Sequence, residues 1–230
     1  MTISQSQERR RRRAPEVIRK EAIAVARHIL VSDGPSAVTL QSVAGALGMA
    51  HGNITHHFGS AANLQAALAD TLIADLLTTV VSGTGDLRAG VISEADLVAI
   101  IFDVFEESGV GRLFGWLAAQ GSPHLAPLYS RLGRLPDVLA SDSQDDSAFT
   151  ADELPAVIAT LVVSALGASL IGRELSDSLD LPWSFMRTHA AADLRARRVT
   201  ARAHKPDRTR CENPVADSKP GLKCAIGSAA

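Results

Sequence analysis

A short polar segment has the residue types that bind metals or nucleic acids; it comprises His51, Asn53, Thr55, His56 and His57. Zinc held by one helix needs two ligands four residues apart, but the three histidines are spaced by five, six and one. We therefore expect no metal here. The amide of an asparagine can pair with N6 and N7 of adenine, and an imidazole can contact phosphate. The segment is thus a candidate for contact with DNA.

The rest of the chain has no motif typical of an enzyme. GxSxG, HExxH, a P-loop and a strand-bounded GxGxxG are all absent from the sequence, and no obvious nucleophile accompanies His124 or His189. Cys211 and Cys224 both lie in a tail that contains Gly, Pro and Lys, so neither a disulfide framework nor a CxxC metal knuckle is indicated. We expect a binding protein with no catalytic residues and no cofactor.

Helical patterns surround the polar segment. Apolar residues at three- and four-residue steps predict a first helix from Pro15 to Asp33. Thr39 is placed to cap a short second helix, which Gly48 ends, and a third short helix runs to Phe58. Two short helices joined by a three-residue turn have the dimensions of a helix-turn-helix, whose second helix enters the major groove of DNA.

Residues 38–64, reading VTLQSVAGALGMAHGNITHHFGSAANL, resemble the DNA-binding segment of TetR-family transcriptional regulators. With the first helix included, the resemblance covers about a quarter of the chain. It rests on Thr39, Val43-Ala44, Gly48-Met49, Gly52 and His57-Phe58. The residues expected to contact DNA are Thr39, Gln41, Ala50, His51, Gly52, Asn53, Thr55, His56 and His57.

Two positions depart from the family pattern. Thr55 stands where the family usually has tyrosine, and Ala61 stands where it usually has lysine. Both family residues are usually implied in phosphate contact, which supplies affinity without sequence information. The arginines at 9–13 could compensate, because a basic arm can enter the minor groove or lie along phosphates. The alternative for residues 1–14 is a flexible, solubilising tail.

Charge is unevenly distributed along the chain. Residues 1–60 hold eight Lys and Arg against four Asp and Glu, residues 61–194 hold six against eighteen, and residues 195–230 hold nine against three. A basic amino-terminal part on an acidic body suggests that only that part meets a polyanion. The excess of arginine over lysine, 19 to 4, together with abundant alanine, favours a bacterial source with a GC-rich genome.

The remaining pattern predicts an all-α chain with a helix-turn-helix domain at 15–60 and a helical ligand-binding and dimerisation domain at 61–200. Ser60 can cap a fourth helix that runs to Val80, followed by a loop at 82–85. Further helices are predicted at 94–107, 112–120, 152–179 (the longest candidate) and 182–199, the last ending in basic residues that suit the helix dipole. Residues 123–140 are expected to be broken by prolines, and 201–230 to be disordered.

Resemblance to the TetR family implies that the body binds a small molecule and that its last two long helices pair with a second subunit. Large side chains that could line an apolar pocket are Phe102, Phe105, Phe114, Trp116 and Tyr129. An apolar stripe that could pair subunits comprises Val157, Leu161, Ala165, Ala168 and Ile171. Packing within the chain's own core is the alternative for both sets. An acidic edge at Asp103, Glu106 and Glu107 could attract a cationic ligand or simply be solvated.

These features together predict a cytoplasmic homodimer that represses transcription and leaves an inverted-repeat operator when a small-molecule effector binds. The alternatives are a DNA-binding regulator without an effector and a helical adaptor that binds only protein. No signal peptide is visible, and no membrane association is expected. The longest uncharged stretch, Leu154–Gly172, spans 19 residues but contains proline, glycine and hydroxyl residues, which favour a buried or interface helix.

Overall fold

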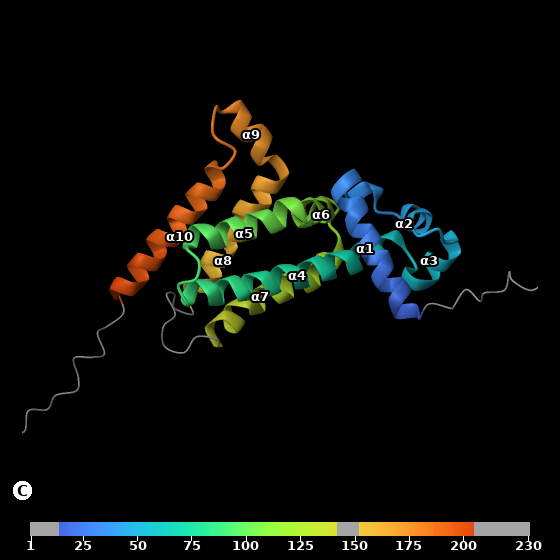
Figure 1. Ribbon diagram of the computed structural model, residues 1–230, viewed down its shortest axis with the longest axis horizontal. Coiled ribbons are helices and arrows are strands. Elements are labelled where there is room, and N and C mark those ends of the chain that lie inside the picture. The colour runs from blue at the N-terminus through green and yellow to red at the C-terminus, as the bar shows by residue number, and fades with distance from the viewer. Residues whose placement is uncertain (1–13, 142–151, 205–230) are drawn as a thin grey trace, which may run out of the picture.

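The computed structural model describes residues 14–141 and 152–204, and this part of the chain is helical with no β-strand (Figure 1). The predicted all-α class is therefore confirmed. In chain order the helices are α1 (Pro15–Asp33), α2 (Leu40–Ala46), α3 (His51–Phe58), α4 (Ala61–Arg88), α5 (Glu94–Glu107), α6 (Val110–Ala119), α7 (Ala126–Ser141), α8 (Leu154–Gly167), α9 (Arg173–Ser178) and α10 (Phe185–His204). Short 3₁₀ turns lie at Pro35–Ala37 and Pro123–Leu125. The predicted arm and tail, at 1–13 and 205–230, lie outside the described residues, and so does the segment 142–151.

Helices α1, α2 and α3 form the head, residues 14–60, at one end of the molecule (Figure 1). The predicted caps are confirmed. The Thr39 hydroxyl accepts a hydrogen bond from the backbone N–H of Ser42, and the Ser42 hydroxyl accepts one from the N–H of Thr39. Gly48 has a φ of 62°, which an L-residue rarely adopts, so the chain can turn between α2 and α3. Ser60 caps α4 by accepting from the N–H of Asn63.

The body, residues 61–141 and 152–204, begins with α4, which is longer than predicted. The prediction of a loop at 82–85 is wrong, because α4 continues through these residues to Arg88. Gly83 is buried in the helix, and a Cβ atom added there would lie 2.8 Å from Cδ1 of Leu97. The glycine thus serves close packing of α4 against α5, where sequence alone indicates a helix breaker.

Helix α7 also corrects the prediction of a broken segment, because it runs unbroken from Ala126 with Pro136 inside it. Its buried residues Leu128, Leu135 and Leu139 recur at spacings of seven and four, so the apolar face is continuous past the proline. Arg88 donates a hydrogen bond of 2.6 Å to the carbonyl oxygen of Leu139. Packing of α7 on α4 and α8 therefore outweighs the tendency of proline to break a helix.

The predicted helix at 152–179 is observed as one 25-residue helical run, Leu154–Ser178, in which a π-helical turn at Ala168–Gly172 separates α8 from α9. With 28 residues α4 is longer, so the expectation that this would be the longest helix is wrong. Helix α10 continues through His204, so residues 201–204 are helical rather than disordered. The arginines expected at its end, Arg195, Arg197 and Arg198, lie inside it and form ion pairs instead.

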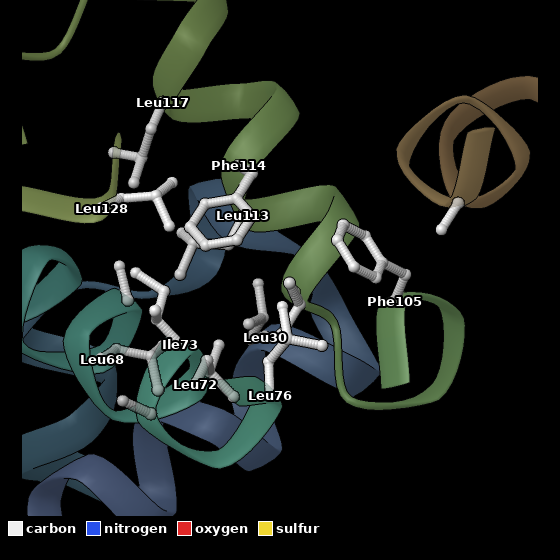
Figure 2. Packing of buried hydrophobic residues seen from close by; sticks show 14 of the residues in the cluster. Leu30, Leu68, Leu72, Ile73, Leu76, Phe105, Leu113, Phe114, Leu117 and Leu128 are labelled. Atoms are coloured by element: carbon white, nitrogen blue, oxygen red, sulfur yellow. The ribbon is translucent and has the colours of Figure 1, made fainter. Parts of the chain in front are cut away.

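One hydrophobic core extends from Ile18 in α1 to Leu194 in α10 and so joins the head to the body. Figure 2 shows the joint, where Leu30 of α1 meets Leu72 and Leu76 of α4, with Leu113 of α6 close by. Arg112 donates a hydrogen bond of 3.0 Å to the carbonyl oxygen of Val31 beside it. The first helix is thereby held by α4 and by the start of α6.

Two described helical runs, Ala61–Arg88 and Leu154–Ser178, are long and apolar enough to cross a membrane by length and composition. Helices in the core of a globular protein pass the same test. In α4 39% of the most apolar window is buried, whereas in Leu154–Ser178 17% is buried. The second run thus exposes an apolar face.

The contact between α6 and the π turn generates a stability prediction. A Cβ atom at Gly111 would lie 2.6 Å from Cβ of Ser169 and 3.1 Å from the carbonyl oxygen of Phe105. We expect Gly111→Ala to lower the free energy of unfolding by about 1–3 kcal/mol through overpacking.

The matched control is Gly133→Ala in α7, where an added Cβ meets nothing within 4 Å. This change should raise the stability by about 0.5–1 kcal/mol, because alanine is the better helix former. Urea unfolding of the two variants measures both effects. Equal stability changes in the two variants would contradict the close packing of α6 on the π turn.

Candidate DNA-binding surface

Helix α3 is held by its apolar side and exposes its polar side. Ile54 is fully buried and Phe58 is 5% exposed, four residues further along the helix. His51, Gly52 and Asn53 are exposed at the first turn. Ile54 and Phe58 share one face because residues four apart lie above one another on a helix. The predicted base-reading turn is therefore accessible.

The side chains of the later part of α3 have different surroundings. His56 is exposed, whereas Thr55 and His57 are half-buried. The Thr55 hydroxyl donates to the carbonyl oxygen of His51 at 3.0 Å, so its hydrogen is used within the helix. Asn53 makes one side-chain contact, from Nδ2 to Sδ of Met49 at 3.7 Å, which leaves its oxygen available for a base edge.

The remaining candidates lie on α2 and in the turn before α3. Gln41 and Ala50 are exposed, and Ala50 is the residue that precedes the first turn of α3. Thr39 is half-buried, and its hydroxyl is engaged in the capping box of α2. A structural role for Thr39 is thus visible, and its predicted contact with DNA stays a prediction.

Arg19 positions the recognition helix, and this residue was not predicted from the sequence. Its Nη1 donates to the carbonyl oxygen of His57 at 2.8 Å, and its guanidinium lies 4.7 Å from the ring centre of Phe58. The hydrogen bond satisfies a carbonyl at the end of α3 that has no partner within the helix. The two residues are 38 positions apart, so no local pattern connects them.

The aromatic side chains predicted to line a pocket occupy three kinds of position. Phe102, Phe105 and Phe114 are 0%, 1% and 7% exposed and belong to the core, and Figure 2 shows Phe114 beside Leu113. Trp116 is half-buried against that core, and Tyr129 is 61% exposed on α7. The structure does not bring Tyr129 together with the core phenylalanines. The pocket stays a prediction.

Two of the three residues in the acidic edge of α5 are paired within the chain rather than simply solvated. Arg187 of α10 forms an ion pair with Asp103 and donates to Glu106 at 2.7 Å. Its guanidinium also lies 5.0 Å from the ring centre of Trp183. Burial acts to lower the pKa of Arg187, but hydrogen bonds and charges from the two carboxylates raise it. Glu107 is exposed.

A second ion pair joins α10 to the start of α5. Glu94 accepts from Arg198 at 2.7 Å, and the two side chains are 17% and 13% exposed. Hydrogen bonding to the backbone at the start of α5 lowers the pKa of Glu94, burial opposes this effect, and Arg198 and Arg195 lower it further. Helix α10 is thus fixed to α5 near both ends of α5.

The apolar stripe predicted to pair subunits lies mostly inside the chain. Val157 and Leu161 are 6% and 9% exposed and Ala165 is fully buried, whereas Ala168 is half-buried and Ile171 is 58% exposed. The larger exposed apolar side chains in this region are Val163, Leu170, Leu175, Leu179 and Trp183. Figure 1 shows α9 projecting beyond the rest of the body, so several of these residues lie on a prominent part of the surface.

The comparison with solved structures finds a similar fold in a protein that was crystallised as a "multidrug binding protein EbrR complexed with imidazole". The match has a TM-score of 0.54 and 20% sequence identity, and it covers 78% of this chain and 93% of that chain. No family model and no curated protein matches the sequence. The chain shares the fold of that protein, and in this chain an amino-terminal helix-turn-helix, α2 and α3, precedes a helical body.

The ion pairs of α10 generate a second prediction. Arg187→Met should lower the free energy of unfolding by about 1–3 kcal/mol, because Asp103 and Glu106 lose the cation that compensates their partly buried charges. The control is Arg197→Met, which removes an exposed pair with Asp193 four residues earlier. We expect that change to cost at most about 0.5 kcal/mol.

Urea unfolding measures both variants, and amide hydrogen exchange reports whether α10 opens locally. A stability loss for Arg187→Met no larger than that for Arg197→Met would show that the contact contributes little to docking of α10.

Proposed function

We propose that this chain is a sequence-specific DNA-binding transcriptional regulator, a homodimeric repressor that a small-molecule effector releases from a palindromic operator in the bacterial cytoplasm. The observation that carries the proposal is the exposed first turn of α3, with Asn53 accessible on a helix anchored by Ile54 and Phe58. The TetR-type fold supports it. A protein with this fold and this surface fits DNA binding better than catalysis.

In the proposed complex α3 enters the major groove. Asn53 reads an adenine through its amide, and Ala50, His51 and Gly52 lie at the same turn, which faces the groove. Gln41 reaches a base edge or a phosphate from the rim of the groove, while Thr39, Thr55, His56 and His57 lie near phosphates. The basic arm at 1–14 supplies further phosphate contacts in place of the tyrosine and lysine that Thr55 and Ala61 replace.

The exposed apolar residues of α8, α9 and the following turn support a homodimer. A second copy would cover Val163, Ile171, Leu175 and Trp183, which are 48–68% exposed in the single chain. A two-fold dimer places two copies of α3 on one face of the duplex, so the operator would be an inverted repeat.

Effector release requires a connection between the body and the head, and the joint at Leu30 provides one. Leu30 packs against Gly109, where an added Cβ would lie 2.9 Å from its side chain, and Arg112 holds the carbonyl oxygen of Val31. A ligand bound near α5 and α6, among Phe102, Phe105, Phe114 and Trp116, would shift α6 and thereby α1 and α4. The ligand favours release of DNA only to the extent that it binds the DNA-incompetent arrangement of the helices more tightly than the DNA-competent one.

The proposal is tested first by selection of genomic fragments that the purified full chain binds. A shared inverted repeat is expected, and Asn53→Ala should weaken binding to it by about 1–3 kcal/mol and relax the preference at one position per half-site. Gln120→Ala, which removes an exposed amide at the end of α6, is the control and should leave binding unchanged. A chain that shifts no DNA would favour the protein-binding adaptor.

The dimer and the effector are tested together. Light scattering should give twice the chain mass, and effectors should lower operator affinity about 5- to 150-fold. The chain has two tryptophans, so Trp183→Phe leaves Trp116 as the reporter of binding in the body. Ligands that change Trp116 emission without changing operator affinity would favour the regulator without an effector, and a monomer on DNA would overturn the inverted repeat.

A further inference from the structure

Permanent cations are missing from α2 and α3, the two helices that carry most of the candidate DNA-binding residues. Between Arg27 and Arg88 the sequence contains no lysine or arginine, and it contains four of the chain's seven histidines there, at 28, 51, 56 and 57. This interval includes α2, α3 and nearly all of α4. A protein gains most of its sequence-independent affinity for DNA from cations placed on phosphates. On α3 the histidines are the side chains that can supply them.

Two arginines of α1, Arg19 and Arg27, already have partners within the chain. The guanidinium of Arg19 binds the carbonyl oxygen of His57 and lies over Phe58. Arg27 forms a 2.8 Å ion pair with Asp75 of α4. Both contacts direct these groups to the protein's own atoms.

The ionisable groups on the helices packed against α3 are few. Helix α2 carries none, and α4 carries none before Asp70, which pairs with Arg131 at 3.3 Å. Helix α1 carries Glu16, Arg19, Lys20, Glu21, Arg27, His28 and Asp33, of which Arg19 bonds to α3. Within α3 the rings of His56 and His57 lie edge to face with centres 5.8 Å apart.

The geometry at His51 is compatible with a charged imidazole. The Thr55 hydroxyl donates its hydrogen to the carbonyl oxygen of His51. The lone pairs of the Thr55 oxygen can therefore accept a hydrogen bond from Nδ1 of His51, 3.4 Å away. An Nδ1 that carries a hydrogen suits this arrangement, and Nε2 remains for a partner outside the helix. His56 is exposed, so its ring is accessible to a phosphate.

We propose that α3 contacts DNA phosphates through protonated histidines, so that DNA binding by this protein is pH-dependent and strengthens as the pH falls from 8 to 6. The inference rests on the proposed function and specifies the chemistry of its DNA contacts. A phosphate favours the charged form of a neighbouring imidazole, so binding takes up protons. By linkage, each histidine that takes up a proton raises the affinity by at most about tenfold per pH unit of decrease.

The test measures binding of the full chain to a labelled duplex of mixed sequence, about 30 base pairs long, by fluorescence anisotropy at pH 6 and pH 8. Phosphate contacts do not depend on sequence, so no operator is needed. We expect the affinity to be about 10- to 100-fold higher at pH 6. The variant with His51, His56 and His57 all changed to Gln should lose most of this dependence and bind as weakly at pH 6 as the unaltered chain does at pH 8.

Two further variants make the test specific. His56→Lys supplies a permanent cation and should raise the affinity at pH 8, while His124→Gln in the body should leave the pH dependence unchanged. Circular dichroism checks that each variant folds. Equal affinity of the unaltered chain at both pH values, or a pH dependence that persists in the triple variant, would overturn the inference and leave the proposed function standing. Absence of binding at both pH values in all variants would overturn the inference and the proposed function together.

Discussion

The arrangement of the whole molecule depends on the burial of Leu30 between α1, α4 and the start of α6. This side chain is fully buried, and Gly109 approaches it so closely that no larger residue fits. Gly109 also has a φ of 78°, so a side chain there would be strained as well as crowded. Because one core then runs from the head into the body, the orientation of α3 is set by packing in the body. A flexible linker would not do this.

Local signals were sufficient to predict the head. Thr39, Gly48 and Ser60 act through the backbone within a few residues of themselves, so their roles as caps and turn are visible in the sequence. The contacts of α3 with its surroundings are not local. Arg19 reaches its end from 38 residues away, and only the folded chain brings them together.

The body was predicted less well for the same reason. Gly83 and Pro136 are helix breakers by local propensity, but both lie inside helices because neighbouring helices pack against them. The pairing of the acidic edge is not predictable from local pattern because its partner, Arg187, is more than 80 residues further along the chain. The candidate ligand and dimer residues depend on bound molecules or a second chain, and no pattern within one sequence distinguishes them from an ordinary core.

The ion pairs of Arg187 have a consequence for synthesis of the protein. Arg187 follows Glu106 by 81 residues in the chain. Because chains grow at about 5–20 residues per second, Arg187 is translated about 4–16 s after Glu106. During that interval Asp103 and Glu106 have no cation from α10, and Phe102 lacks the guanidinium that lies 5.8 Å from its ring centre. A nascent chain that has released α1–α7 from the ribosome therefore exposes an acidic and aromatic strip. Docking of α10 on α5 is therefore completed only after Arg187 has been translated and released.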